Sequence, residues 1–173
     1  VFLLSAGHYA AIWYSALARA GCFSLNELST LRKINSRLQG HPAPFHTHGV
    51  AGVEVASGAL GQGLSVAVGA ALASRLSKKT NRVYVFMGDG ELDEGQVWEA
   101  ALTSAHYKLD NVCGIIDYNK FQIDGRVEEV KGLEPLKAKW QAFGWKVFEI
   151  DGHNIKEVID SYDKAEKIKG KPS

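Results

Sequence analysis

Two short apolar runs, Arg82–Met87 and Asn111–Asp117, enclose a segment with helical periodicity, Asp93–Tyr107. Apolar runs of this length are typical of buried strands, and the segment between them is long enough for a helix. A strand–helix–strand crossover is almost always right-handed and makes its two strands parallel, so that their carboxyl ends open at one edge of the sheet. The pattern therefore predicts an α/β fold, in which a parallel β-sheet is flanked by helices on both faces.

The rest of the chain continues the alternation of strands and helices. The apolar start, Val1–Ser5, predicts a strand. Ser24 and Glu27 form a Ser-x-x-Glu pattern that predicts a capping box, so we expect a helix from Ser24 to about Gly40. Proline and histidine residues in His41–Val50 predict an irregular loop. The other elements that we expect are helices Tyr9–Ala20 and Gln62–Leu76, a strand Trp145–Ile150 and a helix capped by Asn154.

Composition is that of an ordinary soluble domain. The chain has 173 residues, of which 46% are hydrophobic and 23% charged, and we expect a single domain over residues 1–173. A net charge of +1 predicts no binding to nucleic acid or to an anionic membrane surface. No apolar run approaches the ~20 residues that cross a bilayer, and no signal peptide is recognisable. Cys22 and Cys113 lie far apart, which favours reduced thiols and a cytoplasmic protein.

Both ends of the sequence favour a fragment. The chain begins on an apolar, strand-like run without an initiator methionine, and Lys167–Ser173 leaves a helix before another apolar strand is reached. We therefore expect more strands of the same sheet in the parent protein.

Polar side chains follow both strands of the strand–helix–strand unit. Gly88-Asp89-Gly90 comes directly after the first strand and Asn119 follows the second, so Asp89 and Asn119 are expected in one crevice. Carboxylate and amide oxygens suit Mg²⁺ or Ca²⁺, and Mg²⁺ is usually shared with phosphates. Gly88 and Gly90 would let the backbone approach those phosphates. The pattern predicts a metal-dependent diphosphate site, with Asp89 at a strand end outside the core.

Other interpretations of these residues fit less well. Gly88-Asp89-Gly90 taken alone is equally typical of a turn. Asp89, Glu91 and Asp93 imitate the first ligands of an EF-hand, but glycine is missing at position 6 and Ala100 occupies position 12. Neither this turn nor Gly58–Gly63 supplies the Gly-x-Gly-x-x-Gly of a dinucleotide site in the right context.

The segment from Gly88-Asp89-Gly90 to Asp117-Tyr118-Asn119 matches the thiamine diphosphate fingerprint, and the sequence around it resembles transketolase. The stretch Phe45–Ala51 departs from the usual sequence of that family. Its histidines, His46 and His48, have no further ligand at zinc spacing and are interpreted as ordinary loop residues. The segments that carry the resemblance are Ser5–His8, Leu38–Pro42, Gly52–Glu54, Ser57–Gly63, Gly88–Ala100 and Phe143–Trp145.

The resemblance implies roles for residues around the cofactor. Asp89, Asn119 and the backbone carbonyl of Phe121 would hold the metal, Mg²⁺ or Ca²⁺. His8 and the amide of Gly90 would contact the diphosphate of thiamine diphosphate. The residues that border its thiazolium ring would be Gly58, Ala59, Leu60 and Ile123.

The resemblance also implies a reaction and a partner. The reaction is the transfer of a two-carbon ketol unit from a ketose phosphate to an aldose phosphate, with His41 over the reacting carbons. His8 and His41 would exchange protons or bond substrate hydroxyls, and Glu94 would belong to a carboxylate network between subunits. The glutamate that activates the cofactor's pyrimidine ring would come from a C-terminal transketolase domain or a separate subunit, in a homodimer or a heterotetramer.

Two alternatives stay open from the sequence. Another thiamine diphosphate enzyme, such as a 2-oxo acid dehydrogenase component or a deoxyxylulose phosphate synthase, would share Gly88-Asp89-Gly90 and Asn119 but not the surroundings of His41 and Trp98. A non-catalytic homologue would keep the fold as an interaction subunit. The intact Asp89, Asn119, His8 and His41 argue against that second alternative.

Overall fold

The structure is a computed structural model that describes all of residues 1–173. Its main sheet has three strands in the order β1-β2-β3, namely β1 (Phe2–Leu4), β2 (Val83–Gly88) and β3 (Val112–Asp117). Both pairings are parallel, with Phe2 opposite Tyr84 and Gly88 opposite Asp117. The parallel sheet expected from the sequence is confirmed, and β2 is its central strand.

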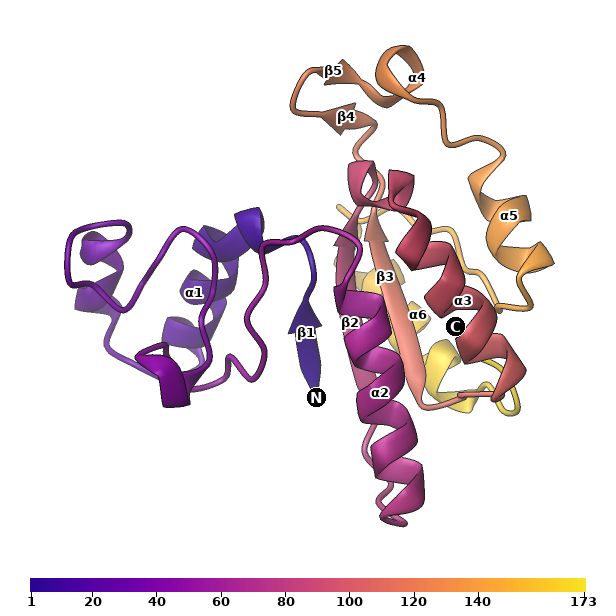
Figure 1. Cartoon of the computed structure of the whole chain (residues 1–173), viewed down its shortest axis with the longest axis horizontal. Coiled ribbons are helices and arrows are strands. Elements are labelled where there is room, and N and C mark those ends of the chain that lie inside the picture. Colours follow the sequence, from indigo (N-terminus) through magenta and orange to yellow (C-terminus); the bar gives the residue numbers. More distant parts are fainter.

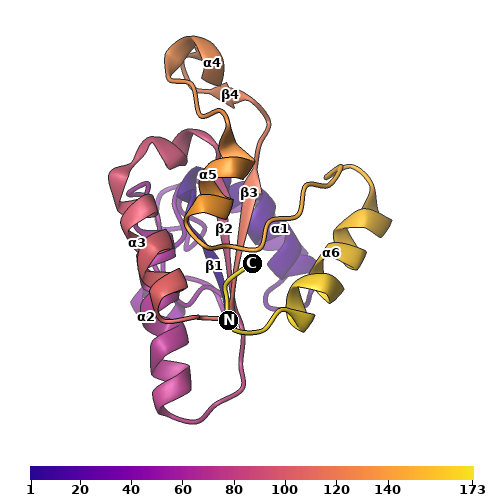
Figure 2. The ribbon, with the colours of Figure 1, turned by 90° about the vertical axis from the view of Figure 1, so that its right-hand side faces the viewer.

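Helices cover both faces of this sheet, as Figures 1 and 2 show. On one face lie α2 (Gly63–Leu76) and α3 (Gly95–His106), and on the other lie α1 (Ala10–Arg19) and α6 (Ile155–Lys167). The alternation of side chains along β2 accounts for both layers. Val83 and Val85 are fully buried in the core with α2 and α3, while Tyr84 meets Tyr162 of α6 edge to face, with 5.7 Å between ring centroids.

A second, smaller core lies around α1. It joins that helix to the irregular segments that follow it, and in Figure 1 this part of the chain stands to the side of the sheet. Its largest fully buried side chains are Tyr14, Leu38 and Val50. The loop expected at His41–Val50 is confirmed apart from a short 3-10 turn, Phe45–Thr47.

The helix expected from Ser24 to Gly40 is wrong. Only a 3-10 helix, Leu25–Thr30, forms there, and the Ser24 hydroxyl oxygen accepts from the amide of Asn26. The carboxylate of Glu27 is bound to the guanidinium of Arg37 through two contacts of 2.8 Å, so it does not close a capping box. Because this ion pair joins residues ten apart, the chain turns back between them instead of continuing as a helix.

The strand expected at Trp145–Ile150 is also wrong, because another segment occupies the edge of β3. The amide of Gly114 donates to Ser173 at 2.8 Å, and the amide of Ser173 donates to Val112 at 3.3 Å. Lys146 then donates to Pro172 at 2.9 Å. The segment after Trp145 therefore lies beside Pro172 and Ser173 and has no strand of the main sheet to pair with.

The other expected helices are confirmed with small shifts of their ends. The helix after β2 begins at Gly95, not at Asp93, because a 3-10 turn, Gly90–Asp93, precedes it. Asn154 caps α6 as expected, since its Oδ1 accepts from the amides of Lys156 and Glu157. No helix combines the length and the apolar composition that a membrane span needs. The remaining elements are a 3-10 turn Gly7–Tyr9, β4 (Phe121–Gln122), β5 (Gly125–Arg126), α4 (Val127–Val130) and α5 (Leu136–Ala142).

Candidate cofactor site at the strand ends

The turn after the central strand holds a buried carboxylate. Asp89 is only 2% exposed, and its two oxygens accept from the backbone amides of Gly90 and Lys120, each at 2.7 Å. Burial raises the pKa of Asp89, and the two amides act in the opposite direction. The expectation that Asp89 lies outside the core is therefore wrong: its side chain joins the turn after β2 to the segment after β3.

The end of β3 and the segment after it add two polar side chains at the same edge, those of Asp117 and Asn119. Asp117 Oδ2 accepts from the hydroxyl of Tyr9 at 3.2 Å and from Asn119 Nδ2 at 3.1 Å. Asn119 Oδ1 accepts from the amide of Phe121 at 2.8 Å. Burial and the nearby charge of Asp117 raise the pKa of Tyr9 to about 12, so the phenol stays a donor. Asp117, which the sequence analysis did not single out, is thus the centre of this group.

These residues fit a divalent cation that is shared with phosphates. The amide of Asp89 donates to the carbonyl of Asp117 at 3.2 Å, so the two acidic residues lie next to each other at the ends of neighbouring strands. Neither of them forms a salt bridge. No group of three His, Cys, Asp or Glu side chains is placed to enclose a metal. An ion at this edge would complete its coordination with amide, carbonyl, water or phosphate oxygens, which is the behaviour of Mg²⁺.

The two histidines to which the sequence analysis gives roles, His8 and His41, both lie near the loop that begins at Gly58. A Cβ on Gly7 would lie 2.7 Å from the backbone nitrogen of Gly58, so the turn that carries His8 and the loop after Ser57 touch through their backbones. Gly58 has a φ of +149°, and a Cβ there would lie 3.4 Å from the ring of His41. Both histidine side chains are exposed. The structure therefore brings the turn that carries His8 and the ring of His41 to the same residue, Gly58.

The other predicted residues surround this group less closely. Glu94 is exposed at the start of α3, and its Cβ is 2.6 Å from the place where a Cβ on Gly61 would lie. Leu60, next to Ala59 in the loop, is 37% exposed. Ile123 is 98% exposed at the tip of the β4–β5 hairpin, which projects from the sheet in Figure 1. The structure places Glu94 beside the loop and Ile123 at the exposed end of the hairpin.

Glu91 is a buried residue at this site that the sequence analysis did not assign. It is 2% exposed and has no basic partner. Its Oε1 accepts from the Ser5 hydroxyl and from the amide of Gly61 at 2.8 Å, and its Oε2 accepts from the amide of Gly88 at 3.3 Å. In the sequence it resembles any acidic residue near the start of a helix, so no local signal distinguishes it.

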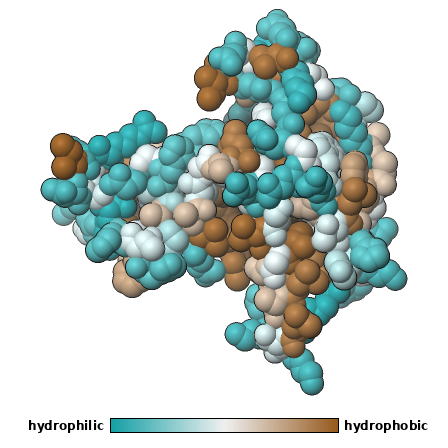
Figure 3. Space-filling view, in the orientation of Figure 1, coloured by the Kyte–Doolittle hydropathy of each residue, from teal (hydrophilic) through white to brown (hydrophobic).

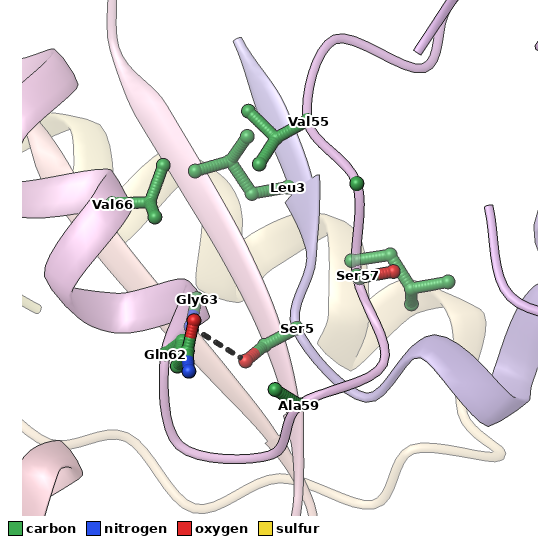
Figure 4. Close-up of a pocket in the computed structure, with 10 residues that line it drawn as sticks. Leu3, Ser5, Val55, Ser57, Ala59, Gln62, Gly63 and Val66 are labelled. Atoms are coloured by element: carbon green, nitrogen blue, oxygen red, sulfur yellow. Dashed lines mark hydrogen bonds between the residues drawn. The ribbon is translucent and has the colours of Figure 1, made fainter. Parts of the chain in front are cut away.

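A hollow of about 290 Å³ lies between β1, the segment around Val55–Ala59 and the start of α2. Figure 4 shows the Ser5 hydroxyl at its floor, accepting from the amide of Gly63 at 3.1 Å. Two of the side chains that line it, Val55 and Val66, are partly exposed, and Figure 3 shows hydrophobic atoms gathered near the middle of this face of the molecule. The residues that line it are Leu3, Leu4, Ser5, Val55, Ala56, Ser57, Ala59, Gln62, Gly63 and Val66.

A parallel sheet whose central strand is followed by Asp89-Gly90, next to a turn that carries Asn119, is the arrangement expected of a thiamine diphosphate-binding domain. Residues 1–173 match the family described as "Transketolase, thiamine diphosphate binding domain". The chain therefore belongs to the transketolase family.

Similar proteins agree with this assignment. The chain is 44% identical over 171 residues to a 6-deoxy-6-sulfo-D-fructose transketolase subunit of a Clostridium species, and 44% identical over 172 residues to an apulose-4-phosphate transketolase subunit of Actinobacillus succinogenes. Each match covers 99% of this chain and 61% of the relative, so the chain spans less than two thirds of their length. A crystal structure of transketolase from Campylobacter jejuni superposes with a TM-score of 0.90 at 35% identity, over 99% of this chain and 27% of that one.

Proposed function

We propose that this chain is the Mg²⁺-dependent, thiamine diphosphate-binding amino-terminal part of a transketolase, and that residues 1–173 form one such domain. The reaction is the transfer of a two-carbon ketol unit from a ketose phosphate to an aldose phosphate. One observation supports the proposal: a chain that matches the family over its whole length has Asp89 bound to the segment that follows β3, and has the turn of His8 and the ring of His41 next to Gly58.

The proposed binding roles follow from the donors at that edge. Asp89, Asn119 and the carbonyl of Phe121 would hold Mg²⁺, whose positive charge would offset the carboxylates of Asp89 and Asp117, which have no basic partner. Gly88, the amide of Gly90 and His8 would contact the diphosphate. Gly58, Ala59, Leu60 and the exposed Ile123 would border the thiazolium ring.

The proposed chemistry divides between cofactor and protein. Thiamine diphosphate, when bound, supplies the electron sink for the carbanion left by cleavage of the donor's carbon–carbon bond. His41 and His8 are exposed next to Gly58, where their ring nitrogens can bond substrate hydroxyls or exchange protons with them. Glu94, beside Gly61, would contribute to a carboxylate network with a second subunit.

The proposal includes a partner and a cellular setting. The glutamate that activates the pyrimidine ring would come from a C-terminal transketolase domain or subunit, in a homodimer or a heterotetramer, and this chain alone would not turn over substrate. Two relatives are named as subunits of transketolases, which favours the separate subunit. Both cysteines are free, which favours a cytoplasmic protein.

The test is metal-dependent cofactor binding by the chain. We expect thiamine diphosphate to bind, measured by isothermal titration calorimetry, when Mg²⁺ is present and not when a chelator is present. Asp89→Ala should abolish this binding, and the nearly isosteric Asp89→Asn should weaken it strongly. Asp163→Ala, which removes an exposed carboxylate from α6, serves as the control and should bind like the wild type.

Three outcomes separate the proposal from its alternatives. Loss of binding in both Asp89 variants, with wild-type circular dichroism, supports the proposed metal site. Cofactor retention by Asp89→Ala in the presence of a chelator would contradict it. Failure of the wild type to bind, alone and with a pyrimidine-domain subunit, would instead support a non-catalytic homologue. Ketol transfer by that mixture, with a ketose phosphate donor and an aldose phosphate acceptor, tests the reaction itself.

A further inference from the structure

The loop that carries the predicted thiazolium neighbours has almost no hydrogen bonds of its own. Residues 58–61 neither donate nor accept any backbone–backbone hydrogen bond; the nearest ones are from Ser57 to Pro42 and from Val66 to Gln62. One side-chain bond reaches this segment, from the amide of Gly61 to Glu91 Oε1 at 2.8 Å. Glu91 therefore supplies the one hydrogen bond that ties residues 58–61 to the rest of the protein.

The same carboxylate is fixed on two other sides. Ser5, at the end of β1, donates its hydroxyl to Oε1 and accepts from the amide of Gly63, and Gly88, at the end of β2, donates to Oε2. All three hydrogen-bond partners of this carboxylate are donors, so both of its oxygens serve as acceptors. A glutamine at position 91 would present an NH₂ group toward one of these donors. The carbonyl oxygen that remains could not serve all three partners.

The diphosphate side of the site is held differently. Gly88 is paired with Asp117 in the β2–β3 ladder, and the amide of Asp89 donates to the carbonyl of Asp117 at 3.2 Å. Asp89 then holds Gly90 and Lys120 through its own carboxylate. The sheet and Asp89 fix this part of the backbone, and its one hydrogen bond to Glu91 is the long one from the amide of Gly88, at 3.3 Å. The two sides of the site are thus anchored by different means.

We propose that Glu91 is a positioning residue that holds the thiazolium side of the cofactor site, residues 58–61, in register with the diphosphate side, Gly88–Gly90. The proposal rests on the proposed cofactor function for the identity of the ligand. Without this carboxylate, a smaller fraction of the molecules has the loop in its binding position. The apparent affinity for a ligand that needs the loop falls in proportion to that fraction. A ligand that needs only the diphosphate side, which the sheet and Asp89 also hold, loses much less affinity.

Amide hydrogen exchange of the full chain tests the anchoring without any ligand. Glu91→Gln should raise the exchange rates of the two loop amides that this network holds, those of Gly61 and Gly63, by about tenfold or more, while β2 and β3 keep wild-type rates. Glu99→Gln, the same substitution at an exposed position of α3, should leave all three segments unchanged. Ser5→Ala, which removes one donor and keeps the carboxylate, should raise the exchange of the same loop to a smaller extent, and it replaces Glu91→Gln if that variant does not fold.

Two ligands then test the functional consequence. Thiamine diphosphate should touch both sides of the site and inorganic pyrophosphate only the diphosphate side, each titrated with Mg²⁺. Glu91→Gln should weaken thiamine diphosphate binding about tenfold or more and change pyrophosphate binding by less than about twofold, by the same population argument. A general loss of stability would weaken both ligands together, so the ratio of the two affinities distinguishes positioning from a structural role.

The outcomes for Glu91 and for the proposed function are separable. Unchanged loop exchange in Glu91→Gln and Ser5→Ala, or an equal loss of both ligands in Glu91→Gln, would overturn the role of Glu91. If the wild type bound neither ligand, the proposed cofactor function would fail, and the exchange experiment would still decide whether Glu91 anchors the loop. Faster loop exchange together with selective loss of thiamine diphosphate supports both.

Discussion

Adding one methyl group at Gly7 should separate the two backbones that meet at the candidate site. A Cβ there would lie 2.7 Å from the nitrogen of Gly58, 2.8 Å from the carbonyl carbon of Ser57 and 2.9 Å from the Ser57 hydroxyl. Ordinary contacts between such atoms are about 3.5–4.0 Å. Gly7→Ala therefore pushes the loop away by roughly 1 Å, since two of the three nearest atoms belong to the backbone and cannot rotate aside.

The cost of that displacement can be compared with a matched substitution. Overpacking of this kind costs about 1–3 kcal/mol, and the melting temperature of a domain of this size falls by about 2–4 °C for each kcal/mol. Gly69→Ala makes the same chemical change in α2, at an exposed position with no heavy atom within 4 Å of the added carbon. Replacing a helical glycine by alanine there should stabilise the chain by roughly 0.5–1 kcal/mol.

Thermal and urea unfolding followed by circular dichroism give the two free-energy changes directly. We expect opposite signs for Gly7→Ala and Gly69→Ala, and under the proposed function Gly7→Ala should also weaken thiamine diphosphate binding, because it moves the loop that begins at Ser57. If Gly7→Ala were as stable as the wild type while Gly69→Ala behaved as expected, the close backbone contact between Gly7 and Gly58 would be wrong.

Two further predictions concern elements outside the site. Asn154→Ala should destabilise the chain by about 1 kcal/mol through loss of the α6 cap, and Asn154→Ser should recover most of it; equal melting temperatures for all three proteins would contradict the cap. The hydrogen bond from Arg37 lowers the pKa of Glu27, so the stability from this pair is present above the ordinary glutamate pKa of about 4.3 and is lost as the pH falls through the lowered folded-state value. Glu27→Gln should therefore lose less stability than the wild type between about pH 5 and 3, and parallel pH profiles would refute the pair.

Local sequence patterns predicted the structure correctly where the conformation of an element depends on its own residues. The apolar runs of β2 and β3 alternate with a helix of the right length, so their parallel pairing followed from chain topology. Asn154 caps α6 through amides two and three residues away, well within a local pattern. Grouping Asp89 with Asn119 needed only the rule that parallel strands end at one edge.

Prediction failed where distant partners decide the conformation. Ser24 and Glu27 satisfy a helix-start pattern, but Glu27 is bound by Arg37, and Arg32 and Asn35 between them have φ values of 61° and 62°. Helical spacing cannot reveal that the chain turns back there to bury Leu38. At the candidate site, Glu91 was missed for the same reason: its partners Ser5 and Gly61 lie 86 and 30 residues away.

The order of the strands explains why one short turn can organise the whole edge. Because β2 is central, its carboxyl end has β1 on one side and β3 on the other. Asp89 reaches toward β3 and binds the amide of Lys120, while Glu91 reaches toward β1 and binds Ser5 together with the loop at Gly61. A turn on an edge strand could reach only one neighbour. The acidic residues at positions 89 and 91 thus act as a pair, one for each neighbouring strand, and replacing either should loosen a different side of the same site.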